Sequence, residues 1–167
     1  SDATESDGVT SFDADGFTVG DDSGDYVNRS SENMVAWQWL AANLSNGSGT
    51  ANGDGTKASV ISVNQTAGFS IVTWTHQTSA NYTVGHGLGA VPKMIIVKTR
   101  NQSTNWGVYH PSITLGNRLR LNDTSNQSSG YWGTNTFNST VFSIGTTRDA
   151  DSSTAVAWCW AEIPGYS

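Results

Sequence analysis

Charged residues are scarce in this sequence: Asp, Glu, Lys and Arg make up only 13% of its 167 residues. Eight Lys plus Arg stand against 14 Asp plus Glu, which gives a net charge of -6. A surface that binds a phosphate backbone needs an excess of basic side chains, so nucleic acid is not expected as a partner. Most of the remaining polarity comes from Ser, Thr, Asn and Gly, without the Ala, Glu and Lys richness of helical proteins.

Cysteine and long apolar runs are also nearly absent. The single cysteine, Cys159, excludes a disulfide within the chain, and its place in the apolar string VAWCWAE predicts a small buried side chain. No run is long enough to cross a membrane, so no membrane insertion is expected. There is no signal peptide and the chain begins at Ser1, which favours a processed product or a piece of something longer.

Short segments rich in β-branched and aromatic residues are what the sequence does contain, with Gly, Asn, Ser or Asp between them. In RLRLN, Leu119 and Leu121 share one face and the two arginines share the other, which is the alternation of a half-buried strand. The pattern predicts an all-β protein, an antiparallel β-sandwich of jelly-roll or lectin-like type. The expected strands cover residues 68–75, 93–99, 106–110, 118–122, 140–145 and 155–163.

The chain contains an internal echo. GFTVG at 16–20 followed by MVAWQWLA at 34–41 matches VFSIG at 141–145 followed by AVAWCWAE at 155–162. Shared order and shared apolar register indicate a repeat, so residues 34–41 are expected to form a strand like 155–162. Residues 1–42 are then the closing hairpin of a preceding unit or an N-terminal extension, 43–67 a Gly/Ser/Asn-rich connection, and 68–167 a complete sandwich. The alternative is coincidence between two Trp-rich strands.

The stretch TVGHGLGAVPKMIIVK, residues 83–98, has glycines at alternate positions around His86. A dinucleotide-binding loop needs G-x-G-x-x-G spacing and a following helix, and neither is present. No carboxylate lies in the segment to support a catalytic His86, and His76, His86 and His110 lack metal-ligand spacing. A bend between two strands is therefore expected, with no catalytic residue, no metal site and no cofactor.

Acidic residues crowd the N-terminal end. DADG at 13–16 is faintly similar to a calcium loop, but it lacks the third oxygen position and the closing Glu of an EF-hand. A solvated acidic surface is the expected role.

Several motifs of residues 67–167 resemble a known family. AGFSIVTWT, TVGHGLGAVPKMIIVKTR, NWGVYHPSI, RLRLND, VFSIGT and VAWCWAEIPGYS are similar, in this order, to a repeated β-domain of tail fibre and other virion proteins of marine bacteriophages, especially cyanophages. Trp74, Trp158 and Trp160 stand where the family pattern has Tyr or Phe. The resemblance implies a structural virion protein in a tail fibre, an appendage or a capsid decoration, and it supplies no catalytic residues.

Three classes of function compete. The first is the non-enzymatic virion module, which contributes to host-surface attachment. The second is a carbohydrate-binding module of a receptor-binding protein or adhesin, which would bind a host cell-surface glycan through exposed rings; core packing is the alternative role for each ring. The third is a glycan-cleaving enzyme, which needs a carboxylate pair across a cleft. The candidate sugar platforms are Trp106, Tyr109, Tyr131 and Trp132, and the available carboxylates are Asp123, Asp149, Asp151 and Glu162.

Assembly is expected because an isolated hairpin is marginal in water and must pack on something. Trp37, Trp39 and Leu40 would otherwise present apolar surface to solvent. The predicted partners are other virion subunits, in a homo-oligomer or array. The expected location is the virion, or a secreted or cell-surface position if the protein is not viral.

Overall fold

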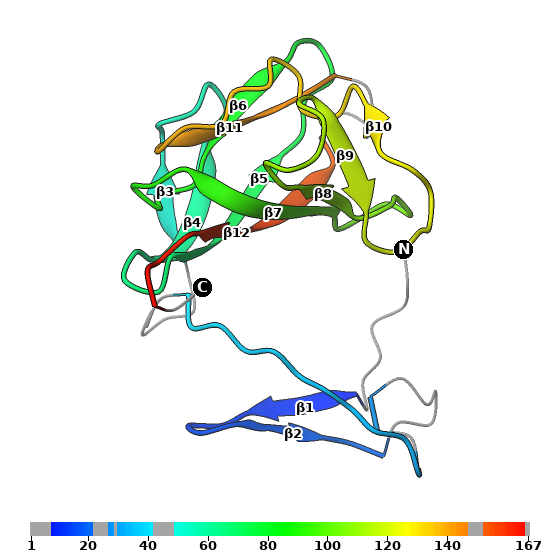
Figure 1. Cartoon of the computed structure of the whole chain (residues 1–167). Helices are drawn as coiled ribbons and strands as arrows, with labels where there is room; N and C mark the ends of the chain where they lie inside the picture. The colour runs from blue at the N-terminus through cyan, green and yellow to red at the C-terminus, as the bar shows by residue number, and fades with distance from the viewer. Residues whose placement is uncertain (1–7, 22–26, 29, 42–48, 147–151, 166–167) are drawn as a thin grey trace. The chain divides into compact units, whose positions relative to one another are not determined.

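The computed structural model describes residues 8–21, 27–28, 30–41, 49–146 and 152–165 (Figure 1). The chain divides into two compact units, residues 39–167 and residues 2–38. Every regular element in the described residues is a β-strand. Within that part of the chain there is no helix with the length and apolarity to span a membrane.

An eight-stranded antiparallel sheet forms the base of the larger unit, in the order β10-β9-β8-β7-β12-β5-β4-β3 (Figure 1). β6 and β11 pair with each other as a second layer. The all-β sandwich prediction is confirmed. The strands of the large sheet are β3 (Thr50–Asn52), β4 (Ser59–Asn64), β5 (Phe69–Thr75), β7 (Pro92–Thr99), β8 (Gly107–Tyr109), β9 (Asn117–Arg120), β10 (Ser128–Ser129) and β12 (Thr154–Ala161); those of the second layer are β6 (Tyr82–Gly85) and β11 (Val141–Ile144).

The core lies between these two layers and is shaped by the small inner residues of β12. Ala155, Ala157 and Cys159 are fully buried there, and successive residues of a strand alternate between faces. Small side chains on the central strand leave space for bulky rings, and Trp132 and Phe142 occupy the same core completely buried. The predicted burial of Cys159 is confirmed, and it raises the pKa of the thiol.

The outer face of the same sheet carries an apolar row. The strand registers place Ile71 beside Trp158, Trp158 beside Ile96, Ile96 beside Val108, and Val108 beside Leu119. These outward side chains are half-buried or exposed. Cross-strand apolar neighbours of this kind stabilise a sheet even on its solvent side.

Strand β9 has the predicted alternation, but its arginine side faces inward. Arg118 is buried, and its guanidinium lies 4.3 Å from the centre of the Tyr131 ring. Leu119 and Leu121 are exposed. The attraction between a guanidinium and an aromatic ring partly replaces the hydration that the charge loses on burial. This strand can therefore turn its arginine side inward and its leucine side toward solvent.

The sandwich begins before the expected boundary at residue 68. β3 and β4 lie within the predicted connection 43–67, and β4 pairs with β5 from Val60 to Asn64. Ile61 of β4 is buried in the core. The alternating Ser and Val/Ile residues of KASVISVN predict an additional edge strand here. In the structure β3 forms the edge and β4 lies one position inside it.

The smaller unit contains a hairpin that also occurs in the larger one. β1 (Val9–Phe12) and β2 (Phe17–Val19) pair Phe12 with Phe17, and their turn is closed by a hydrogen bond from Asp13 N to Gly16 O of 2.9 Å. In the larger unit Phe137 pairs with Phe142, and Asn138 N donates to Val141 O at 3.1 Å. The repeat deduced from sequence therefore has a structural counterpart.

Residues 34–41 do not form the strand that the repeat predicted. They have neither helix nor strand, although their counterpart β12 is the central strand of the sheet. β12 is held by β5 on one side and β7 on the other, whereas no described strand pairs with 34–41. A strand sequence without a partner strand does not satisfy its backbone hydrogen bonds, which accounts for the difference.

Candidate functional site

The glycine-rich stretch around His86 is a structural bend. His86 is fully buried; its Nδ1 accepts a hydrogen bond from Leu88 N at 3.2 Å, and its Nε2 lies 3.1 Å from Asn138 O. The ring is therefore neutral with its proton on Nε2. Burial is the main cause that lowers the pKa of His86 below 6.5, against weaker raising effects of the Asn138 carbonyl and Asp54.

Gly87 shows why this bend needs glycine. Its φ is +72°, a left-handed conformation that L-residues rarely adopt. A Cβ there would lie 2.4 Å from Ile61 Cδ1. The spacing of the glycines thus serves close packing of the β6–β7 connection against β4.

A second buried histidine belongs to a chain of aromatic hydrogen bonds. The Tyr82 hydroxyl accepts from Trp74 Nε1 at 3.0 Å and lies 2.5 Å from His76 Nδ1. The Trp74 Nε1, Tyr82 hydroxyl and His76 Nδ1 atoms thus satisfy one another inside the core. Among the described residues, no group of three or more His, Cys, Asp or Glu is placed to hold a metal ion.

Three of the four predicted sugar platforms are core residues. Tyr109, Tyr131 and Trp132 are buried, so they present no ring face to a ligand. Tyr109 stacks on Phe137 with ring centres 3.8 Å apart, and Trp132 Nε1 donates to Asn117 O at 2.9 Å. Their loop positions in the sequence suggested exposure, but the segment after β10 folds back over the sheet and fills the sandwich interior.

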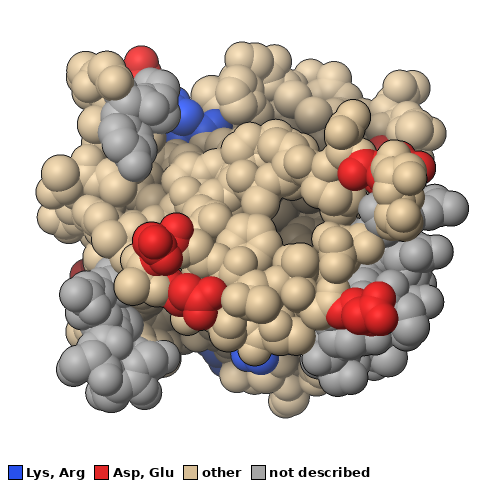
Figure 2. Space-filling view, turned by 90° about the horizontal axis from the view of Figure 1, so that it is seen from below, with Lys and Arg blue, Asp and Glu red and all other residues tan. Residues whose placement is uncertain are grey.

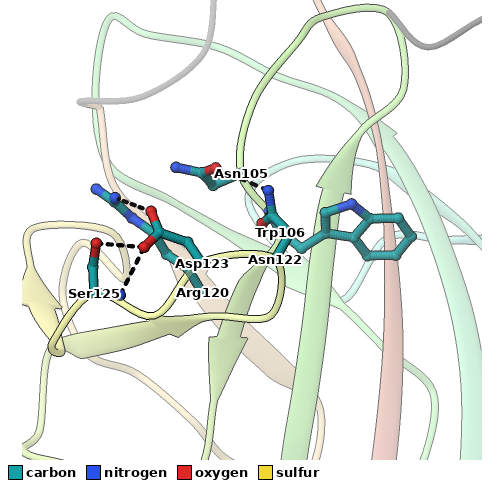
Figure 3. Close-up of polar contacts among 6 residues, drawn as sticks. All are labelled: Asn105, Trp106, Arg120, Asn122, Asp123 and Ser125. Atoms are coloured by element: carbon teal, nitrogen blue, oxygen red, sulfur yellow. Dashed lines mark hydrogen bonds and ion pairs between the residues drawn. The ribbon is translucent and has the colours of Figure 1, made fainter.

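Trp106 is the predicted platform that remains partly exposed. Its ring stacks on Trp158 with centres 5.5 Å apart and points away from the polar contacts of the neighbouring loop (Figure 3). The loop is fixed by Asn122, whose Oδ1 accepts from Trp106 N at 3.0 Å and whose Nδ2 donates to Asn105 Oδ1 at 3.0 Å. Trp106 therefore caps the outer apolar row of the sheet.

Asp123 is engaged in the same loop and is not poised as a catalytic carboxylate. It accepts hydrogen bonds from Ser125 N and Oγ and from Arg120 Nη1, the last at 2.8 Å (Figure 3). The Ser125 hydroxyl, then Arg120, lower the pKa of Asp123 to about 2. Asp149 and Asp151 lie outside the described residues.

An open groove that the sequence did not reveal lies at one end of the sheet. Its volume is about 720 Å³, and we call it the Trp39 groove. Its lining combines residues from the start of β7, from just after β8, from the end of β12 and the residue after it, and from the segment before β3. The lining residues are Trp39, Lys93, Met94, His110, Pro111, Trp160, Ala161 and Glu162.

The aromatic side of the Trp39 groove is a cluster of three rings. Trp39 lies 5.3 Å from Trp160 and 5.9 Å from Phe69, measured between ring centres. Phe69 is buried, whereas Trp39 keeps 44% of its surface exposed. Trp39 thus packs on the sandwich with one side and faces solvent with the other.

A protein family described as "Domain of unknown function (DUF7483)" matches residues 1–167. The chain belongs to this family. The match to the DUF7483 family covers both compact units, including the N-terminal hairpin. No curated protein and no solved structure matches the chain.

The residues predicted for assembly are placed differently from one another. Trp39 belongs to the larger unit and packs on Phe69 and Trp160 within it, while Trp37 is 71% and Leu40 is 66% exposed. The surface seen in Figure 2 is largely uncharged, with separate acidic side chains and few basic ones. Residues two apart share one face of a strand, so nothing in the sequence signalled that Trp37 and Trp39 would differ in exposure. The groove itself could not be deduced either, because its residues come from four distant segments.

Proposed function

We propose that this protein is a non-enzymatic structural module of a bacteriophage virion, in a tail fibre, appendage or capsid decoration, and that it works in an array of like units. The observation that carries the proposal is the duplicated hairpin. In the larger unit this hairpin is covered: Phe137 packs against the core and stacks on Tyr109. In the smaller unit the equivalent Phe12 is 87% exposed.

The exposed apolar residues of the N-terminal segment, residues 8–41, supply the driving force for assembly. Burial of large apolar side chains contributes about 1.5–3 kcal/mol each. Exposed apolar surface of this extent marks interaction sites in soluble proteins. The residues concerned are Val9, Phe12, Met34, Val35, Trp37 and Leu40.

The virion location is supported by the resemblance of the motifs in 67–167 to phage virion β-domains. We propose a non-enzymatic role because side chains that could take part in catalysis are buried or already hydrogen-bonded within the protein. His86 is buried and hydrogen-bonded, the thiol of Cys159 has a raised pKa, and the Asp123 carboxylate is held by Ser125 and Arg120.

Sedimentation equilibrium of the whole chain over micromolar to millimolar concentrations tests the assembly claim. We expect a mass that rises with concentration. Replacing both Phe12 and Trp37 by Ser removes about 3–6 kcal/mol of apolar burial from the contact, which weakens association about a hundredfold or more.

Leu115→Ser is the matched control, since Leu115 is also exposed but lies outside the N-terminal segment. It should leave the association unchanged. A monomeric mass at every concentration, or equal weakening by the control, would show that the N-terminal segment is not an assembly surface.

Carbohydrate binding is the second candidate function. Tyr109, Tyr131 and Trp132 are buried, so they cannot bind a sugar. The observation in favour of this function is instead the Trp39 groove, whose lining includes the partly exposed ring of Trp39.

A further inference from the structure

We propose that the Trp39 groove binds a neutral oligosaccharide. This inference rests on the second candidate function above, carbohydrate binding, and adds the class of sugar and the residues that would hold it. The groove volume of about 720 Å³ lies within the range of roughly 300–1,000 Å³ that is usual for small-molecule sites. Its open form suits a chain-like ligand that enters from the side.

The aromatic cluster provides the apolar half of such a site. Sugars present faces of C–H groups that pack on aromatic rings. Trp39 rests on Phe69 and Trp160, which hold it from one side and leave 44% of its surface exposed. A ring held in this way loses little conformational freedom when a ligand packs on it. Met94 and Pro111 extend the apolar lining next to it.

The polar groups of the groove provide both donors and acceptors. Lys93 Nζ and Glu162 Oε2 lie 4.0 Å apart, with their side chains 51% and 68% exposed. His110 Nδ1 accepts from Ser112 N at 3.2 Å, which leaves Nε2 for a further hydrogen bond. Hydroxyl groups can donate to the carboxylate and accept from the ammonium and the imidazole.

The balance of charge distinguishes a neutral sugar from an acidic one. One basic and one acidic side chain line the groove together, so no net field favours a sulfated or sialylated ligand. A dedicated anion site would instead collect several basic groups, as expected for charge-assisted recognition. The combination of apolar rings with a few convergent polar groups fits a neutral polyhydroxylated chain.

The experiment uses the whole chain at low micromolar concentration and three neutral probes, cellotetraose, maltotetraose and a mannotetraose, with a sulfated and a sialylated oligosaccharide beside them. Binding is followed by tryptophan fluorescence and by calorimetry. We expect saturable binding of at least one neutral probe. A response to none of the three, or to the charged oligosaccharides alone, overturns the proposal.

Two tryptophans only two residues apart provide a matched pair of variants. Trp39→Ala removes a ring that lines the groove and should weaken binding about tenfold or more. Trp37→Ala removes a more exposed ring that is not part of the lining, so affinity should be unchanged. Equal losses in both variants would place the sugar elsewhere and overturn the proposal.

Far-ultraviolet circular dichroism and the melting temperature show whether Trp39→Ala still folds. If it does not, Glu162→Gln is the replacement variant. It keeps the size of an exposed side chain but removes the charged acceptor. We expect about threefold to tenfold weaker binding with an unchanged melting temperature. Unchanged affinity in Glu162→Gln together with unchanged affinity in Lys93→Gln, which removes the other charged group of the lining, would also overturn the proposal.

Discussion

Phe137→Ala in the covered hairpin should destabilise the larger unit strongly, while the equivalent Phe12→Ala should not. Phe137 stacks on Tyr109 with ring centres 3.8 Å apart and meets Trp132 edge-on at 5.6 Å. Two aromatic pairs are worth about 0.5–1.5 kcal/mol each beyond their area burial. Adding the lost apolar burial and the remaining cavity gives a loss of about 3 kcal/mol in the free energy of unfolding.

The comparison is measured by urea unfolding and thermal melts at low protein concentration, where assembly does not contribute. A loss of about 3 kcal/mol corresponds to a melting temperature lower by about 10 °C for a unit of this size. Phe12 is 87% exposed, and its removal should change the stability by less than about 0.5 kcal/mol. Similar losses in the two variants would refute the conclusion that one copy of the hairpin is covered and the other is not.

Three further predictions concern pH and backbone conformation. Because burial lowers the pKa of His86, the unfolded chain takes up a proton at this residue before the folded chain does as pH falls below 6.5. The free energy of unfolding should therefore drop by up to about 1.4 kcal/mol per pH unit until the folded pKa is reached. Denaturant melts of His86→Gln should lack this slope. NMR titration of the Asp123 carboxyl should give a pKa of about 2, and Ser125→Ala should raise it toward 3.8; the stabilising effect of this carboxylate is then present above the unfolded pKa and is lost as pH falls toward 2. Gly87→Ala should cost about 1–3 kcal/mol in chemical melts, because φ is +72° and the added Cβ meets Ile61, whereas Gly53→Ala, which has open space around it, should not. An unshifted His86 slope, an ordinary Asp123 pKa or a neutral Gly87→Ala would each contradict the corresponding contact.

The sequence predicted β5, β7, β8, β9, β11 and β12, because their β-branched and aromatic runs are bounded by turn residues. It did not predict β3, β6 and β10, which are short and lie in Gly-, Asn- or Ser-rich stretches. It failed where pairing decides the outcome. Residues 34–41 and β12 have nearly the same apolar pattern, yet only β12 has neighbours on both sides, β5 and β7. Pattern determines which face of a strand would be buried, and it does not reveal whether a partner strand is available.

Aromatic residues beside loops were the other source of error. Tyr131 and Trp132 follow a Ser- and Gly-rich stretch that resembles an exposed turn in sequence, but they enter the core from the loop after β10. Local composition cannot show such a return of the chain. The same limit applies to the Trp39 groove, since Trp39 and Trp160 lie far apart in the sequence and meet only in the fold.

The central position of β12 has a consequence for how this protein is made. Strands β3, β4 and β5 pair in succession, as do β7, β8, β9 and β10, so each set can form from local hairpins. The two sets meet only through β12, which follows all of them in the chain. Until the ribosome has released Thr154–Ala161, β5 and β7 each expose an unpaired edge that can capture other chains. The sandwich is therefore expected to close only once β12 has emerged, and correct folding depends on keeping those two edges from other chains until then.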